Sequence, residues 1–158
     1  MSYFFQPSRI FELAAEFEKN GVDFYAYLAE RNRVPEMKKS FGFLARQEAL
    51  HQSTFLKMAR ELKGCETEQE YSIDIPTAMQ LAFDESKSTV LNLSRLNDID
   101  RLAAEEFFSL ALRTEDASIK FYEVMRGAYS ERFSGVLDQI IAEEKDHRSM
   151  LLSLKEKW

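Results

Sequence analysis

A glutamate recurs at the same place in four long stretches of helical periodicity, and this pattern limits the folds open to the chain. Each stretch carries apolar or aromatic residues in alternating steps of three and four, the spacing of one buried helix face. In each stretch a glutamate interrupts that face, followed three positions later by a small residue or a histidine. Burying a lone carboxylate costs several kcal/mol, so the pattern predicts an all-α fold with positive charge among the acids. The four glutamates are Glu18, Glu48, Glu115 and Glu144.

The four stretches are predicted to form four helices, over residues of about 8–31, 35–63, 97–127 and 130–158. Pro7 and Ser8 favour the start of the first helix, with Ser8 as its N-cap, and Pro35 suits the first position of the second. Gly64 is expected to end the second helix, and Asn97 with Asp100 resembles a capping box at the start of the third.

Connection lengths predict how these helices are arranged. Only a few residues join the first helix to the second and the third to the fourth, which favours two antiparallel hairpins. Residues 64–96 form a longer link with a shorter helical stretch at about 77–93. The sequence thus predicts a four-helix bundle of two antiparallel hairpins joined by one long crossover that contains a short helix. We expect residues 1–158 to form one domain; the alternative is a five-helix bundle without that crossover.

Composition excludes several classes of function. A net charge of −6 argues against a nucleic-acid or anionic-membrane surface, both of which require clustered Lys and Arg. With one cysteine, Cys65, the chain cannot form an internal disulfide or a cysteine-based metal site. No apolar run approaches the roughly 18 residues that span a bilayer, and the N-terminus lacks the pattern of a signal peptide. We therefore expect a soluble cytoplasmic protein.

The two histidines of the chain each lie three residues after one of the recurring glutamates, as Glu48-x-x-His51 and Glu144-x-x-His147. Residues three apart share a helix face, so the carboxylate and the imidazole can reach one ion. Such ligands suit iron, manganese or zinc better than calcium or magnesium. Four carboxylates would balance two divalent ions. The predicted metal ligands are Glu18, Glu48, His51, Glu115, Glu144 and His147.

An internal repeat selects the same residues. A shift of 97 places the first helix on the third and aligns six identical pairs: Phe11/Phe108, Leu13/Leu110, Ala14/Ala111, Glu18/Glu115, Phe24/Phe121 and Tyr25/Tyr122. A shift of 96 places Glu48 and His51 on Glu144 and His147. Such a duplication predicts pseudo-two-fold symmetry, with a pair of metals across the axis.

Simpler interpretations apply to some residues. A single Glu-x-x-His is common on exposed helices, and the case for a metal depends on all six residues in register. Tyr25 and Tyr122 lie two turns beyond Glu18 and Glu115, where they could be core residues or catalytic phenols that hydrogen-bond a ligand or donate an electron. The acids off the apolar face are expected to be solvated, although Glu143 or Asp146 could support a ligand. These acids are Glu12, Glu16, Asp23, Glu105, Asp116, Glu143 and Asp146.

At these residues the sequence resembles the rubrerythrin branch of the ferritin-like superfamily. The segments that carry the resemblance lie at residues 18–25, 47–51 and 143–147. The resemblance implies a ferritin-like di-metal bundle with a Glu from each of two helices and a Glu-x-x-His from each of the other two. It also implies two iron ions, bridged by Glu48 and Glu144, with Glu18 and Glu115 terminal and one histidine on each iron. Bundles of this class usually form dimers or larger oligomers.

The sequence departs from the family in two features, which bear on the expected peroxide chemistry and not on the expected metal ligands. Rubrerythrins usually carry a rubredoxin-like domain with paired Cys-x-x-Cys motifs, which this chain lacks. They also commonly have a further glutamate, associated with peroxide reduction, where this chain has Ser118. The leading hypothesis is a non-haem di-iron oxidoreductase that reduces H2O2 or O2 with electrons from an external donor such as a rubredoxin. The alternatives are a ferroxidase that handles iron, and a scaffold or partner-binding bundle with a structural metal.

Overall fold

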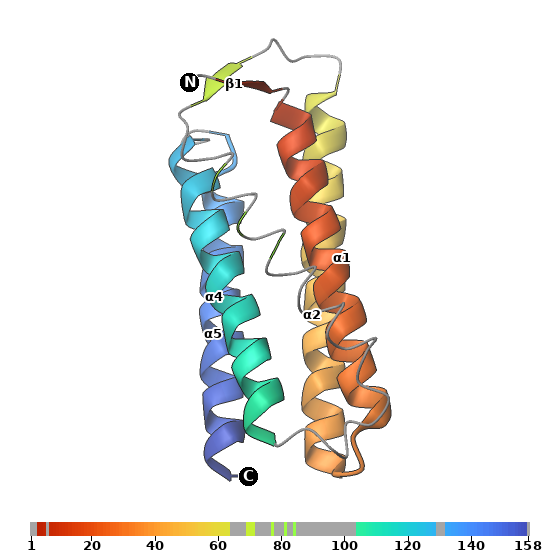
Figure 1. Ribbon diagram of the computed structural model, residues 1–158. Coiled ribbons are helices and arrows are strands. Elements are labelled where there is room, and N and C mark those ends of the chain that lie inside the picture. Colours follow the sequence, from red (N-terminus) through yellow and green to blue (C-terminus); the bar gives the residue numbers. More distant parts are fainter. Residues whose placement is uncertain are drawn as a thin grey trace. The chain divides into compact units, whose positions relative to one another are not determined.

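The computed structural model describes residues 3–5, 7–63, 69–71, 77, 81, 84, 104–128 and 132–157. The chain divides into two compact units, Met1–Pro76 and Thr77–Trp158. Each unit contains a pair of long helices that lie side by side (Figure 1). The predicted helix at 77–93 lies mostly outside the described residues, although residues 77, 81 and 84 are helical. Cys65 also lies outside them.

The first unit is built on helices α1 (Pro7–Arg31) and α2 (Pro35–Leu62). Helix α1 begins at Pro7, so the prediction that Ser8 caps it is wrong. Proline suits the first helical turn because a backbone N–H at that position would have no partner within the helix. Val34 precedes α2 in an extended conformation, with Pro35 as the first helical residue. The side chain of Asn32 accepts a hydrogen bond from the Val34 N–H at 3.0 Å, which fixes the short turn between the helices.

A small antiparallel sheet in the first unit was not predicted. Strand β1 (Tyr3–Phe5) pairs with strand β2 (Gln69–Tyr71), with Tyr3 opposite Tyr71 and Phe5 opposite Gln69. The two strands lie at the N-terminal end of α1 and beyond the C-terminal end of α2 (Figure 1). The pairing therefore ties together two segments that flank the helix pair.

The second unit is built on helices α4 (Ala104–Ala128) and α5 (Ser134–Lys157). The predicted start of the third helix, with its capping box at Asn97, lies outside the described residues. The fourth helix was expected from Ser130, but α5 begins at Ser134. Phe133 is buried, and its carbonyl accepts the N–H of Leu137 at 3.0 Å, so the helical hydrogen bonds start there.

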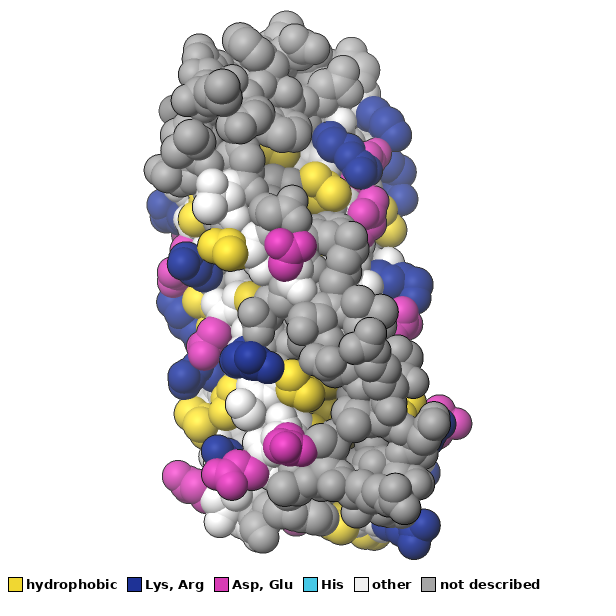
Figure 2. Space-filling model, in the orientation of Figure 1, with side chains coloured by type: hydrophobic (Ala, Val, Ile, Leu, Met, Phe, Trp, Pro, Cys, Tyr) yellow, Lys and Arg dark blue, Asp and Glu magenta, His cyan; other side chains and the backbone are white. Residues whose placement is uncertain are grey.

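The predicted apolar faces are the buried faces of all four helices. The largest fully buried side chains include Phe11, Tyr25, Phe41, Phe55, Phe108, Tyr122 and Leu137. On the face drawn in Figure 2, charged side chains of both signs lie interspersed over the described residues. None of the described helices is long and apolar enough to cross a membrane. Burial thus follows the three-and-four spacing and includes the polar residues that interrupt the apolar faces.

Candidate metal centre

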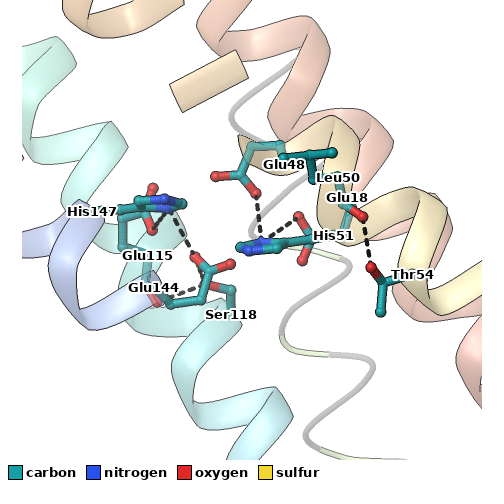
Figure 3. A network of polar contacts seen from close by, with 9 residues as sticks. All are labelled: Glu18, Glu48, Leu50, His51, Thr54, Glu115, Ser118, Glu144 and His147. Atoms are coloured by element: carbon teal, nitrogen blue, oxygen red, sulfur yellow. Dashed lines mark hydrogen bonds and ion pairs between the residues drawn. The ribbon is translucent and has the colours of Figure 1, made fainter. Parts of the chain in front are cut away.

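The first unit brings together Glu18 from α1 with Glu48 and His51 from α2, a set that we call the first half-site. His51 Nδ1 lies 3.8 Å from Glu18 Oε2 and 3.9 Å from Glu48 Oε2. One possible ligand atom from each of the three residues lies within 4.8 Å of the others. Figure 3 shows both carboxylates directed towards the imidazole. Adjacent packing of α1 and α2 and the three-residue spacing on α2 together produce this convergence.

The second unit repeats the arrangement with Glu115 from α4 and with Glu144 and His147 from α5, the second half-site. His147 Nδ1 lies 3.7 Å from Glu115 Oε2 and 3.7 Å from Glu144 Oε2. Here too one possible ligand atom per residue lies within 4.8 Å of the others. The geometry expected from the sequence repeat is therefore found in both hairpins.

All six residues are buried, with relative exposures of 1–4 %. Each half-site holds two carboxyl groups and one imidazole, so two ionised carboxylates would carry more negative charge than one protonated histidine could balance. The distances from each histidine Nδ1 to the glutamate oxygens, 3.7–3.9 Å, are longer than hydrogen bonds. These possible metal-ligand atoms therefore lie around a common point. Carboxylate oxygens and imidazole nitrogen are ligands that iron, manganese and zinc accept. The donor set therefore fits a divalent metal in each half-site.

The acids off the apolar faces behave differently, as the sequence predicted. Glu16, Asp23, Glu105, Asp116 and Asp146 are exposed, and Glu12 and Glu143 are partly exposed. Several pair with surface cations, such as Asp23 with Lys19 at 2.7 Å and Asp116 with Arg148 at 2.6 Å. Glu143 accepts a hydrogen bond from Gln139 at 2.9 Å. The fold thus separates four buried acids from these seven.

Ser118 contacts the second half-site directly, a role that the sequence did not reveal. Its hydroxyl, with one proton to donate, lies within hydrogen-bonding distance of two acceptors: Glu144 Oε2 at 3.1 Å (Figure 3) and the backbone carbonyl of Glu115 at 2.9 Å. Ser118 is 3 % exposed. Its place three residues after Glu115, on the same helix face, was the signal that could have identified it.

Gly21 occupies the equivalent position in the first unit, three residues after Glu18. A Cβ atom at Gly21 would lie 3.2 Å from Glu48 Cγ and 3.4 Å from Glu48 Oε2. The Glu48 side chain therefore packs against a helix surface that is bare because the residue is glycine. Sequence alone could not show this contact, because it depends on how closely α1 and α2 approach.

Tyr25 and Tyr122, the predicted catalytic phenols, are both fully buried. The Tyr25 ring stacks on Phe41 at a centroid distance of 6.4 Å and lies 4.9 Å from the ring of Phe24. The Tyr122 ring lies 5.4 Å from that of Phe121. These contacts agree with core packing, and a catalytic role for either tyrosine stays a prediction.

Comparisons with known proteins agree with this geometry. A sequence model of the family described as Rubrerythrin matches residues 9–155. No curated protein matches the chain significantly. A crystal structure described as a ferritin-like diiron-carboxylate protein from Thermotoga maritima matches with a TM-score of 0.71 and 23 % identity, covering 98 % of this chain and 97 % of that one. The chain therefore has the predicted fold, a ferritin-like four-helix bundle.

Proposed function

We propose, from the premise that this chain belongs to the rubrerythrin family, that its two half-sites together bind two iron ions and make it a non-haem di-iron oxidoreductase. The observation that carries the proposal is the repeated trio of two buried glutamates and one histidine, once in each hairpin. The distances from histidine nitrogen to glutamate oxygen are nearly equal in the two units, which is expected if each unit holds a similar ion.

The roles of the six residues follow from their chemistry. Each histidine would supply a neutral nitrogen to one ion, and each terminal glutamate, Glu18 or Glu115, would supply oxygen to the same ion. By resemblance to the family, Glu48 and Glu144 would help to hold both ions. The four carboxylates would offset the charge of two divalent ions and keep the buried centre near neutrality.

The expected substrates are H2O2 and O2. Reduction of H2O2 with two protons to two molecules of water takes two electrons, and two bound Fe(II) ions would supply one electron each. The six candidate ligands are only 1–4 % exposed, and this burial would limit access of bulk water to the half-sites. Electrons to restore the ferrous state would come from an external donor such as a rubredoxin, because this chain has no paired cysteines of its own.

The test is metal content followed by reaction. Protein purified without added metal, then loaded anaerobically with Fe(II), should bind two ions per chain, and stopped-flow mixing with H2O2 should consume one peroxide per two Fe(II). Glu48→Ala and Glu144→Ala should each abolish most of this reaction, whereas Glu16→Ala, at an exposed site on α1, should not. A wild-type chain that never binds two equivalents of metal would contradict the proposal.

A second candidate function is iron handling, in which oxidation of Fe(II) serves storage or delivery. Ser118 favours it, because the family commonly has at this position the glutamate associated with peroxide reduction. Iron handling predicts that O2 oxidises Fe(II) faster than H2O2 does and that iron accumulates far beyond two ions per chain. Light scattering and iron content after repeated additions of Fe(II) separate the two functions.

A further inference from the structure

We propose that the outer face of α2 docks an acidic one-electron carrier protein, which delivers electrons to the first half-site beneath it. The inference rests on the proposed di-iron function and adds the surface at which the external donor binds. The surface, which we call the α2 stripe, consists of six exposed residues in alternating steps of four and three: Lys39, Phe43, Arg46, Leu50, Ser53 and Lys57.

The spacing of the α2 stripe places its six side chains along one line of the helix. Steps of three and four residues keep side chains on the same helix face. The buried residues of α2, which include Glu48 and His51, follow the same spacing on the opposite face. From residue 39 to residue 57 the stripe extends over roughly 27 Å, which is close to the diameter of a small domain. A small carrier protein could therefore contact most of it.

The charge of the α2 stripe is entirely positive, although the chain as a whole carries a net charge of −6. Residues 37–60 contain a single acid, Glu48, and that side chain is only 4 % exposed. At a salt concentration of about 0.1 M, charges more than about 10 Å apart are largely screened from one another. An approaching protein then responds to the nearby cations more than to the net charge of the chain. The complementary partner is an acidic one.

The stripe also carries exposed apolar surface. Phe43 is 40 % exposed, and Leu50, at 60 %, has the highest exposure of the large apolar side chains that the structure describes. Arg46 lies between them in the stripe. Apolar residues with charge at the rim are typical of protein interfaces, in which arginine is enriched. Short-lived redox complexes need only a small interface, below roughly 1,200 Å².

The position of Leu50 indicates why the partner is an electron carrier. Leu50 directly precedes His51, whose side chain is buried and whose Nδ1 lies 3.8 Å from Glu18 Oε2. One peptide bond therefore joins the most exposed part of the stripe to a candidate metal ligand. Electron transfer slows steeply with distance, so this is a short path from the surface. Two reduced carriers, each losing one electron, would return two ferric ions to the ferrous state.

The equivalent stripe on α5 has different chemistry. A shift of 96, which aligns His51 with His147, places the α2 stripe on six exposed residues that include no cation and one acid. Asp146 takes the place of Leu50, and Ala142 that of Arg46. The six residues are Gly135, Gln139, Ala142, Asp146, Ser149 and Ser153. The hairpins share their candidate ligands and differ on this outer face, so we expect the carrier to dock on the first hairpin.

A second copy of this chain fits the α2 stripe less well than an acidic carrier does. In a two-fold symmetric dimer the same surface of both copies meets. Lys39, Arg46 and Lys57 would then face the same three cations of the other copy, and such like-charge contacts are unfavourable.

Binding to the whole chain as purified tests the surface independently of iron chemistry. The probe is a dye-labelled rubredoxin of net negative charge, followed by fluorescence anisotropy at about 0.1 M salt, where the Debye length is about 10 Å. Wild-type chain should bind it, and Arg46→Glu and Leu50→Asp should each weaken binding by about 10-fold. At about 1 M salt, where the Debye length is about 3 Å, wild-type binding should weaken far more than binding by Arg46→Glu.

The electron path is tested on chain that has been loaded with iron and oxidised with H2O2. In anaerobic stopped-flow mixing, reduced rubredoxin should lose its electron to wild-type chain, and Arg46→Glu and Leu50→Asp should slow this reaction by about 10-fold. Reduced methyl viologen, a small cation that needs no docking surface, should be oxidised no more slowly by either variant.

The matched control is Lys120→Glu, at an exposed position of α4. It changes the net charge by the same amount as Arg46→Glu but lies outside the α2 stripe. Rubredoxin binding and oxidation should stay close to wild type, so equal losses in the two variants would mean that net charge, not the stripe, controls docking and would overturn the inference.

Three other results would overturn the inference. The first is a wild-type chain that does not bind the acidic carrier at about 0.1 M salt. The second is a dimer that Leu50→Asp dissociates while carrier binding is unchanged, which would assign the stripe to a second copy. The third is Arg46→Glu chain that no longer binds phosphatidylglycerol vesicles yet binds rubredoxin normally. Fewer than two ions per wild-type chain would instead overturn the proposed function, whether or not the carrier binds.

Discussion

At the scale of single residues, burial distinguishes acids that lose their hydration on folding, at a cost in stability, from exposed acids that keep it. Glu18 is 1 % exposed, whereas Glu16, two residues earlier on the same helix, is exposed and pairs with Arg9 at 3.3 Å. The sequence predicted this difference because the three-and-four spacing assigns Glu18 to the apolar face and Glu16 to the outer one. A buried acid retained against its desolvation cost is a sign of function.

Glu18→Gln should stabilise the metal-free protein. The substitution keeps the shape of the side chain and removes one of two like charges beside His51, so the free energy of unfolding should rise by about 1–2 kcal/mol. Urea unfolding in the presence of a chelator measures the change, and Glu16→Gln should stay within about 0.5 kcal/mol of wild type. With metal present the order should reverse. A metal-free Glu18→Gln protein less stable than wild type would contradict the charge argument.

Two glycines within helices allow a matched comparison. In Gly42→Ala the new Cβ would meet only Arg46 Nη1 at 3.7 Å, so the variant should gain about 1 kcal/mol from helix propensity. In Gly21→Ala the new Cβ would displace Glu48 by a few tenths of an ångström, so the gain should be smaller and Co(II) affinity of the first half-site should fall. Urea unfolding and Co(II) binding measure both effects. Equal gains with unchanged affinity would show that the Gly21 contact has no effect.

At the scale of helices and strands, the regular parts were predictable and the pairings between distant segments were not. The bounds of α1 and α2 came within a residue or so of the prediction because proline marks their starts and periodicity marks their length. The sheet of β1 and β2 escaped prediction because three-residue strands are too short to show an alternating pattern. The start of α5 shifted because burial of Phe133, a tertiary effect, fixes where its hydrogen bonds begin.

Ion pairs link the helices within each hairpin. Lys63, just after α2, contacts Glu12 of α1 at 3.1 Å, and Arg126 of α4 contacts Asp138 of α5 at 2.8 Å. Hydrogen bonds from Lys63 and then from Arg9 lower the pKa of Glu12 below its ordinary 4.5. A lowered pKa means that the folded state favours the charged carboxylate. This stabilisation is present above the unfolded pKa of about 4.5 and is lost as pH falls through the lower folded pKa.

Lys63→Met should therefore have a pH-dependent effect. At pH 7 it should lower the free energy of unfolding by about 0.5 kcal/mol, as expected for an ion pair near the surface. In acid, well below the lowered folded pKa of Glu12, the carboxyl is protonated and the difference from wild type should disappear. Urea unfolding at both pH values measures it, with Lys57→Met at an exposed position of α2 as the control. A difference that persists unchanged in acid would mean that Lys63 acts through packing.

At the scale of the whole molecule, the fold was predictable from length, helix count and the repeat, and the match to a solved ferritin-like structure confirms it. The composition of each half-site was also predictable, since register on the buried face selected the residues that converge. What the sequence lacked was contact detail: Ser118 on Glu144, and Gly21 under Glu48. Such contacts depend on the rotamer of a long side chain, which no spacing rule determines.

Metal removal should destabilise the whole protein. An ion that binds only the folded state, at 100 times its Kd, adds about 2.7 kcal/mol to the free energy of unfolding. For a chain of this size such a change should move Tm by about 5–10 °C. Thermal unfolding with Fe(II) or Mn(II) and then with a chelator measures the shift, and Ca(II) at the same concentration should produce much less. An unchanged Tm with every transition metal would contradict a metal bound in the folded state.

The repetition of one half-site in each hairpin also has an evolutionary meaning. A protein assembled from two copies of a single hairpin would need the same residue at both equivalent positions, because one gene would encode both. Fusion of two copies into one chain removes that restriction, and each copy can then accumulate substitutions of its own. Gly21 and Ser118 are such a divergence, at a position that contacts a metal-ligand candidate in both hairpins. Duplication thus preserved the ligands while freeing their surroundings to specialise.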